Sequence, residues 1–203
     1  MTDHTNHLRR ADWTVAPTEH RVAVRLIEAW HYSKSAPNTS VARHGLYRRS
    51  DAALTGDPYG VAMWMPPTRS AGESIAGEHW RNVLNLSRLA VDPDLPTNAA
   101  SYLLGASMRL IDRERWPVLV TYADTALGHT GAIYLATNWT RQGETKAGDV
   151  WIGPEGQRRG RKRGGRNLSA DDMRALGFER APALPKIRFV HDPQGLCSTS
   201  SIG

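Results

Sequence analysis

The alternation of hydrophobic and polar residues along the chain predicts a mixture of strands and helices. Residues 118–122 (VLVTY) are β-branched and aromatic, which is typical of a buried strand. A hairpin is predicted next to the loop that contains Gly56, Asp57 and Pro58, because a strand-like segment stands on each side of it. The predicted strands besides residues 118–122 are residues 43–49, 59–65, 82–91, 150–152 and 186–191.

Apolar residues at helical spacing indicate four helices. They are about a dozen residues from Pro17, residues 98–112, about ten residues from Gly128 or His129 to Asn138, and a short helix that opens at Ser169. Ser169 with Asp172 three residues later resembles a capping box, and Gly177 ends that helix. Residues 66–80 show neither pattern and predict an irregular connection.

Asp124 lies where the strand at 118–122 meets the helix that follows it. Polar groups at the carboxyl end of a sheet strand are where open α/β folds bind their ligands. A carboxylate at that place is also a common cap of the following helix. This stretch by itself supports a functional and a purely structural interpretation equally.

The order of elements predicts one α/β domain over residues 17–191, with a mixed central sheet flanked by helices. The chain has 203 residues and is 40% hydrophobic, which is enough for a substantial core. We expect residues 1–16 and 192–203 to be flexible, and residues 158–166 to form a basic loop.

Composition favours a cytoplasmic protein without structural disulfides. No apolar run approaches the roughly 18 residues that a membrane span needs, and the N-terminal residues lack the apolar core of a secretory signal. Cys197 is the single cysteine, which excludes a disulfide framework and a cysteine-rich zinc site. The eight histidines are scattered, so no metal ligand set can be read from the sequence.

Positive charge is concentrated in one segment. The formal net charge is +6, and residues 158–166 (RRGRKRGGR) contain six basic residues, so the rest of the chain is neutral overall (6 − 6 = 0). A compact run of arginine and lysine with glycines is suited to a phosphate backbone. The alternative is a solvated loop.

Three clusters of polar residues are candidates for chemistry. His31, Tyr32 and Ser33 follow the first helix, where the alternative is a histidine that complements the helix dipole. Asp124, Tyr134 and Asn138 form the second cluster. The third is Lys186 and Arg188, whose alternation on a strand is also typical of a solvated face. No serine-hydrolase, P-loop, zinc-protease or paired-cysteine motif is present, and Asp57-Pro58-Tyr59 is interpreted as a turn.

The order of elements resembles the GNAT acyltransferase architecture. In that family a central strand leads into a loop and a helix whose backbone N–H groups bind the pyrophosphate of acyl-CoA. The usual glycine-rich form of the loop is absent, because asparagine and alanine stand where glycines are expected, but a helix N-terminus still suits an anion. The resemblance implies a site for acetyl-CoA or a related acyl donor at Leu89, Val91, Thr97, Asn98, Ala99, Ala100 and Ser101.

The three clusters together resemble the phage Mom family of DNA adenine-modification proteins. The shared features are HYS after the first helix, the pattern YAD-x4-GH-x-G-x2-Y-x-A-x-NW, and a late K-x-R-[FY]-V strand. The resemblance implies a GNAT-like fold and conversion of adenine in DNA to an N6-carbamoylmethyl form that protects phage DNA from restriction. Catalytic roles would fall to His31, Tyr32, Asp124 and Tyr134.

Roles follow from the chemistry of adenine. Its N6 amine is a weak nucleophile, so a carboxylate such as Asp124 would accept its proton while Tyr134 supplies one to the donor's leaving group. A base inside a duplex is out of reach, so base flipping or a single-stranded substrate is expected. The expected DNA contacts are Ser33, Asn138, Arg158, Arg159, Arg161, Lys162, Arg163, Arg166, Lys186 and Arg188.

Two other functions are compatible with these residues. An ordinary GNAT N-acetyltransferase would act on a small amine or a protein and would not need the basic run. A non-catalytic DNA-binding module would bind DNA and leave its bases unchanged. The identity of the donor stays open, because acetyl-CoA alone does not supply the amide nitrogen of a carbamoylmethyl group.

Overall fold

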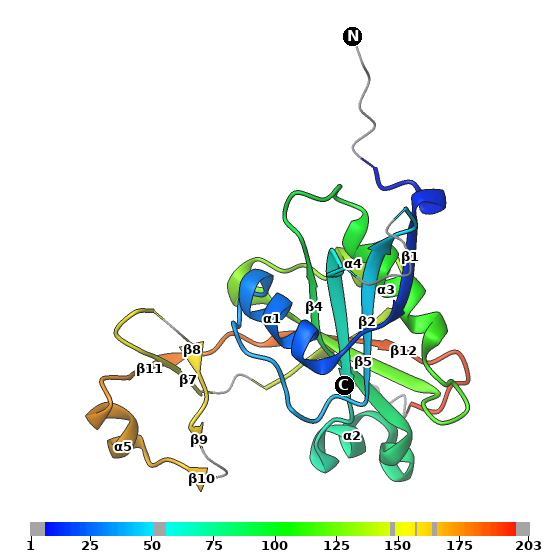
Figure 1. Ribbon diagram of the computed structural model, residues 1–203. Coiled ribbons are helices and arrows are strands. Elements are labelled where there is room, and N and C mark those ends of the chain that lie inside the picture. Colours follow the sequence, from blue (N-terminus) through cyan, green and yellow to red (C-terminus); the bar gives the residue numbers. More distant parts are fainter. Residues whose placement is uncertain (1–6, 51–55, 147–148, 157, 164–165, 198–203) are drawn as a thin grey trace. The chain divides into compact units, whose positions relative to one another are not determined.

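The computed structural model describes residues 7–50, 56–146, 149–156, 158–163 and 166–197 (Figure 1). Two compact units make up the chain. The first comprises residues 1–121, 132–141 and 189–203, and the second comprises residues 122–131 and 142–188. In the described part of the chain, no helix is long and apolar enough to cross a membrane.

A mixed sheet of seven strands in the order β1-β2-β3-β4-β5-β12-β6 forms the framework of the described residues. β1 to β4 pair antiparallel with their neighbours, and β4 pairs parallel with β5. The predicted hairpin is confirmed as the pairing of β2 with β3. The strands are β1 (Trp13–Pro17), β2 (Ala42–Arg48), β3 (Gly60–Met65), β4 (Val83–Val91), β5 (Val118–Asp124), β6 (Thr140–Glu144) and β12 (Lys186–His191).

Helices connect these strands. Three of them are α-helices of two turns or more: α1 (His20–Trp30), α2 (Arg69–Ala76) and α3 (Ala99–Leu110). The remainder are one-turn or 3-10 segments, namely η1 (Arg10–Asp12), η3 (Gly77–Asn82), η4 (Thr125–Leu127) and α4 (Ala132–Leu135). The predicted first and second helices are confirmed as α1 and α3, each with slightly shorter bounds than the sequence indicates.

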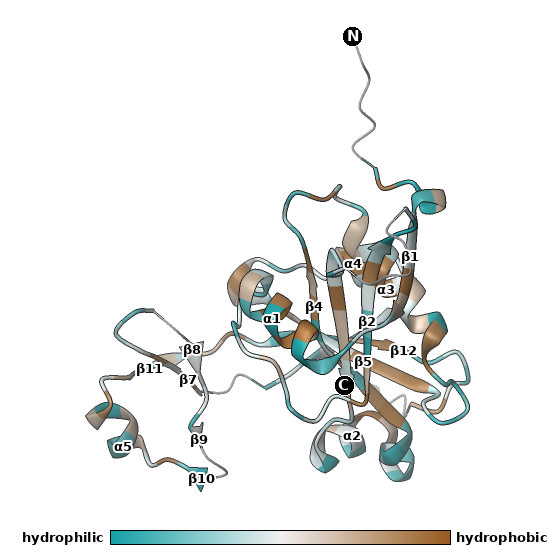
Figure 2. Cartoon of the chain, viewed as in Figure 1, coloured by the Kyte–Doolittle hydropathy of each residue, from teal (hydrophilic) through white to brown (hydrophobic). Residues whose placement is uncertain are grey.

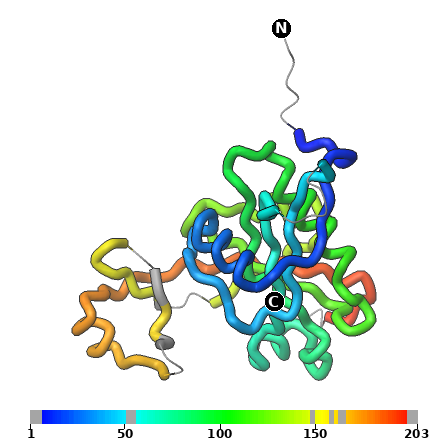
Figure 3. The backbone as a smooth tube through the Cα atoms, in the orientation of Figure 1, coloured from blue at the N-terminus to red at the C-terminus, as the bar shows by residue number. Residues whose placement is uncertain are grey.

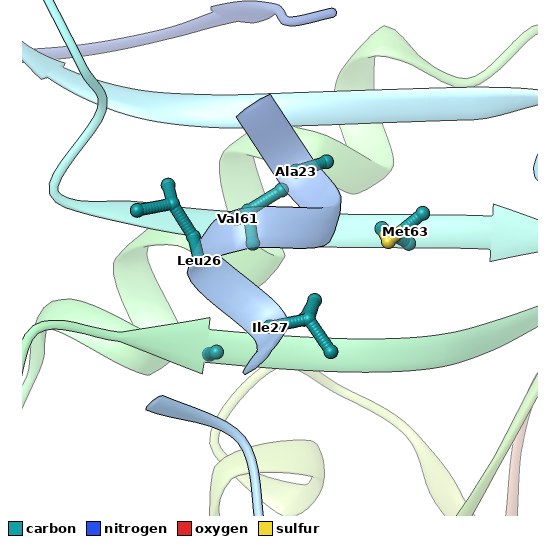
Figure 4. Packing of buried hydrophobic residues seen from close by; sticks show 6 residues of the cluster. Ala23, Leu26, Ile27, Val61 and Met63 are labelled. Carbon is teal, nitrogen blue, oxygen red and sulfur yellow. The ribbon is translucent and has the colours of Figure 1, made fainter. Parts of the chain in front are cut away.

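α1 packs its apolar face on the centre of the sheet. Ala23 and Ile27 of this helix are fully buried against Val61 and Met63 of β3 and Ala90 of β4, as Figure 4 shows for the first four. Burying one such side chain contributes about 1.5–3 kcal/mol, so this contact fixes the helix on the sheet. The HYS segment begins directly after this helix, with His31 as its C-cap residue.

A buried polar network holds α3 on the sheet. Ser107 of α3 accepts a hydrogen bond from Trp64 Nε1 at 2.8 Å and lies 2.6 Å from His44 Nδ1. Because the serine oxygen already accepts from Trp64, its own proton is available for His44 Nδ1, which places the imidazole proton on Nε2. Burial lowers the pKa of His44 from 6.5 to about 4, and the nearby Arg43 adds to the shift.

β4 and β5 separate soon after they meet. Their parallel pairing covers Val83–Asn85 against Val118–Val120, although β4 continues to Val91. The register of β4 against β3 also shifts where Met63 faces Arg88 and Trp64 faces Leu86, so Ser87 is the extra residue of a β-bulge. The bulge and the loss of pairing leave the β5-facing edge of β4 unpaired from Leu86 onward.

The second unit contains a small inserted structure between β6 and β12. It comprises β7 (Asp149–Ile152), β8 (Arg158–Arg159), β9 (Lys162–Arg163), β10 (Arg166–Asn167), α5 (Ala170–Ala175) and β11 (Glu179–Pro182). The predicted capping box is confirmed at the start of α5, where Ser169 and Asp172 bond reciprocally. β10 is strongly hydrophilic, whereas β5 is largely hydrophobic (Figure 2).

Several predicted elements need correction. The ten-residue helix after Asp124 is wrong, because η4 and α4 replace it; the backbone turns at Gly128, Gly131 and Asn138, which all have positive φ. The irregular connection at 66–80 is wrong because α2 and η3 cover most of it. The loop at 158–166 is wrong because β8, β9 and the start of β10 fall inside it.

Besides β8, β9 and β10, three further strands of the described residues have no counterpart in the sequence prediction: β1, β6 and β11. β1 lies within the segment expected to be flexible, and Leu8 just before it is only 6% exposed. The predicted flexibility of residues 1–6 and 198–203 lies outside the described residues.

Candidate active site

Tyr134 reaches the place where β4 and β5 separate. Its ring packs against Phe189 at 5.1 Å and Trp139 at 5.9 Å between ring centroids. Burial raises the pKa of Tyr134, a hydrogen bond with Thr121 opposes the shift, and the nearby Tyr32 adds to it. Thr121 in turn donates to the carbonyl of Leu86, the first residue of β4 beyond the pairing with β5. The phenol therefore keeps its proton at neutral pH at this point.

His31 and Tyr32 form an aromatic pair just after α1. Their ring centroids are 4.2 Å apart and the planes are inclined by 30°. Ser33 N–H donates to His31 Nδ1 at 3.1 Å, so this nitrogen is the acceptor and a neutral imidazole carries its proton on Nε2. His31 is 8% exposed, whereas Tyr32 is 49% exposed. Tyr32 therefore provides the exposed aromatic surface of the pair, on which a planar ring can stack.

Arg88 is a functional candidate that the sequence analysis missed. It follows the bulge in β4, and its guanidinium donates to the carbonyls of Ser35 at 2.7 Å and Ser87 at 2.6 Å. Burial lowers the pKa of Arg88 and the nearby Tyr32 opposes the shift. Within the described residues no carboxylate contacts Arg88, so a partly buried cation lacks an acidic partner. Only the tertiary placement beside Tyr32 distinguishes it from the other arginines.

The first turn of α3 is the predicted phosphate site. Its N-cap, Asn98, makes no side-chain capping bond; the amide instead accepts from Leu8 N–H at 2.6 Å and donates to Leu8 C=O at 3.2 Å. Ser101 Oγ donates to the carbonyl of Asn98. The Asn98 side chain is thus occupied by the N-terminal segment, which leaves backbone N–H groups as the means by which this turn can bind an anion.

Asp124 has both a structural and an electrostatic partner in the second unit. Its Oδ1 accepts from Ala126 N–H at 3.2 Å, which caps η4. Its Oδ2 lies 3.3 Å from Lys186 Nζ, and the Asp124 side chain is only 12% exposed. The capping interpretation is therefore confirmed, and the ion pair adds a partner that the sequence could not indicate. A catalytic role for the carboxylate stays a prediction.

The structure gathers only part of the predicted set. His31, Tyr32 and Tyr134 lie in the first unit with Arg88, and Asp124 with Lys186 lies in the second. Asn138 is exposed with φ of 64°, and it ends the turn of α4. Arg188 is partly buried and donates to the Gln142 carbonyl at 3.4 Å, so the solvated-face interpretation fits it poorly.

No metal centre is evident in the part of the chain that the structure describes, because no group of three or more His, Cys, Asp or Glu side chains converges there. Arg161 and Arg166 of the basic run are exposed. The predicted DNA contacts of this run stay predictions.

A family model described as the Mom protein family matches residues 12–163. Comparison with curated proteins gave no match.

Solved acetyltransferases share the fold. A Bacillus subtilis acetyltransferase in complex with CoA is 8% identical, with 89% of this chain and 97% of that chain covered and a TM-score of 0.50. The aminoglycoside acetyltransferase AAC(6')-Ib in complex with ribostamycin and coenzyme A is 15% identical, with 95% and 99% covered and a TM-score of 0.51. The predicted GNAT-like mixed α/β fold is confirmed.

Proposed function

We propose, because the chain belongs to the Mom protein family, that it is a transferase that modifies adenine in DNA at N6, with a carbamoylmethyl group as the expected product. The observation that carries this proposal is the position of Tyr134. Its protonated hydroxyl bonds to Thr121 at the separation of β4 and β5, close to the aromatic pair of His31 and Tyr32. A proton donor thus stands beside a surface suited to a planar base.

The acceptor side would bind a base removed from the duplex. Tyr32 offers an exposed aromatic face, and stacking on aromatic side chains is how proteins hold unpaired bases. Arg88 lies next to it without an acidic partner among the described residues, so it suits a phosphate of the same strand. The proposed adenine pocket combines stacking by Tyr32 with charge compensation by Arg88.

The proton of the N6 amine must leave as the new bond forms. Amide-like delocalisation makes this nitrogen a weak nucleophile, so a carboxylate that accepts its proton lowers the barrier. We assign that role to Asp124, whose Oδ2 is paired with Lys186 and whose Oδ1 is fixed by the Ala126 N–H. Tyr134 holds the proton that a leaving group requires.

The donor site fits an acyl thioester in part. Beyond Leu86, whose carbonyl accepts from Thr121, the edge of β4 up to Val91 offers backbone groups to an extended chain. In the first turn of α3 the Ala99 N–H already donates to the Pro96 carbonyl at 2.9 Å, which leaves the N–H groups of Ala100 and Ser101 for phosphates. By itself an acyl thioester would give an N6-acyl adenine and release the thiol, so the carbamoylmethyl product requires a further reactant that supplies the amide nitrogen. Asn98 is excluded from direct binding as long as its amide holds Leu8.

Nucleoside mass spectrometry tests the function. DNA from cells that express the protein is digested, and we expect a heavier deoxyadenosine derivative that is absent without the gene. Tyr134→Phe should lose most of this product, whereas Tyr59→Phe, which removes a phenol hydroxyl outside the site, should keep it. A modified pyrimidine with unmodified adenine, or no modified nucleoside at all, would refute the proposal.

A further inference from the structure

The connection between β6 and β12 is far longer than the sheet requires. These strands are neighbours in the sheet, and antiparallel neighbours are normally joined by two to five residues. Here Thr145 N–H donates to the Lys186 carbonyl at 2.9 Å, and Lys186 N–H donates to Thr145 Oγ1 at 3.0 Å. The two bonds close a stem, and residues 146–185 are inserted beyond it. Figure 3 allows this path to be followed from yellow to orange.

The inserted residues fold around a core of their own. β11, β7 and β8 form a three-stranded antiparallel sheet, and β9 pairs with β10. Trp151, Met173 and Phe178 are buried together, with Leu168 and Ala170 packed against them. A solvated loop has no such core. We name residues 146–185 the inserted module.

The inserted module contains most of the excess positive charge. Nine of its residues are basic (Lys146, Arg158, Arg159, Arg161, Lys162, Arg163, Arg166, Arg174 and Arg180) and five are acidic (Asp149, Glu155, Asp171, Asp172 and Glu179), which gives 9 − 5 = +4. The remaining residues together contribute 6 − 4 = +2. Two of the acids are already engaged within α5 and its cap, Asp171 with Arg174 and Asp172 with Ser169. Arg161, just before β9, and Arg166, the first residue of β10, are exposed.

The stem of the inserted module is bonded directly to the end of β5. Thr125, the residue after Asp124, donates from its Oγ1 to the Pro185 carbonyl at 2.6 Å. Lys186, the first residue after the module, forms the ion pair with Asp124 at 3.3 Å. These residues all belong to the second unit. The exit of the module and the proposed catalytic carboxylate are therefore parts of one hydrogen-bonded structure.

We propose that the inserted module is a docking element for the backbone of duplex DNA, folded onto a stem that also holds Asp124. The module's charge supplies phosphate contacts without sequence selectivity, since phosphate contacts position a protein and base edges specify it. Leu168 packs against the module's core, and its N–H donates to the Arg161 carbonyl at 2.9 Å, which connects this arginine to the core. The inference rests on the proposed function in taking DNA as the partner.

The salt dependence of DNA binding tests this proposal. The full chain is titrated, without any donor, into a fluorescent unmodified DNA duplex at several salt concentrations. Each phosphate contact contributes about 0.9 to the slope of log K against log salt, so R161A/R166A should lower that slope by about 1.8. Between 50 and 200 mM salt this corresponds to a roughly tenfold smaller loss of affinity.

A variant with the same charge change outside the module is the control. R10A/R49A removes two exposed arginines from the first unit and should leave the slope close to that of the wild type. An unchanged slope in R161A/R166A, an equal decrease in both variants, or stronger competition by single-stranded RNA than by duplex DNA would overturn the proposal. Because binding is measured without chemistry, a protein that binds as expected yet leaves adenine unmodified would refute the proposed function alone.

Discussion

Replacing Asp124 by asparagine separates its structural role from its proposed chemical role. Asparagine caps helices about as well as aspartate, so the hydrogen bond from the Ala126 N–H at 3.2 Å should survive. The change removes the negative charge and with it the ion pair to Lys186. The amide of asparagine cannot accept the N6 proton in place of the carboxylate.

The expected effects on stability and on activity differ widely in size. The Lys186 side chain is 46% exposed, and solvent-exposed ion pairs contribute about 0.2–1 kcal/mol, so Asp124→Asn should lower the free energy of unfolding by about 1 kcal/mol or less. General-base catalysis contributes on the order of 10²- to 10⁴-fold, so adenine modification should fall by that factor. DNA binding by the full chain should persist.

The assay pairs nucleoside mass spectrometry with a thermal melting curve for each variant. Asp57→Asn is the matched control, because it makes the same chemical change at an exposed ion pair, in which Arg25 Nη1 lies 2.7 Å from Asp57 Oδ2. Lys186→Met reports whether the pair positions the carboxylate, and Lys186→Arg should then restore activity. Near-normal modification by a folded Asp124→Asn protein would leave the aspartate as a helix cap and refute the mechanism.

Three further predictions address the rest of the first unit. Lowering the pH from 7 to 5 should reduce the free energy of unfolding by about 2 kcal/mol through His44, because the pKa of His44 is about 4 in the fold and 6.5 in the unfolded chain, which therefore binds the extra proton. Denaturant melts should show that this loss is smaller in His44→Gln and is kept in His79→Gln. Arg88→Met should abolish most adenine modification and leave the melting temperature unchanged or higher, because a buried cation without a carboxylate partner destabilises the fold. A large loss of stability in this variant would contradict the prediction. Asn98→Ala should release the Leu8 backbone, and hydrogen exchange should detect faster exchange at Leu8 with β4 unchanged.

The sequence was sufficient for the elements whose side chains follow a clear period. The buried strand β5 and the long helix α3 have continuous apolar patterns, and both are confirmed. α2 was missed because its sequence, RSAGESIA, mixes small and polar residues, and only Gly72, Ile75 and Ala76 are buried. β6 was missed because its sequence, TRQGE, contains no buried residue, and only its pairing in the sheet makes it a strand.

Some residues of the candidate site could likewise be predicted from the sequence, and others could not. His31, Tyr32 and Tyr134 could be named from residue type and position, since aromatic and titratable groups next to element ends are typical of pockets. Arg88 could not be named, because the sequence has many arginines and only the bulge at Ser87 and the proximity of Tyr32 make this one unusual. The partner of Asp124 was equally hidden, since Lys186 lies 62 residues along the chain and the pair depends on the stem of the inserted module.

The sequence pattern over residues 122–139 contains residues that shape the backbone and residues with proposed chemical roles. Thr121 and Tyr134 are thirteen positions apart yet share a hydrogen bond, so the chain must leave β5 and reverse within that interval. Gly128 and Gly131 permit the reversal, because their φ angles of 72° and 79° lie in the left-handed region that a side chain disfavours. Asp124 begins the reversal, where its side chain also caps η4, and Tyr134 ends it, so the glycines shape the turn between the two residues whose chemical roles are proposed.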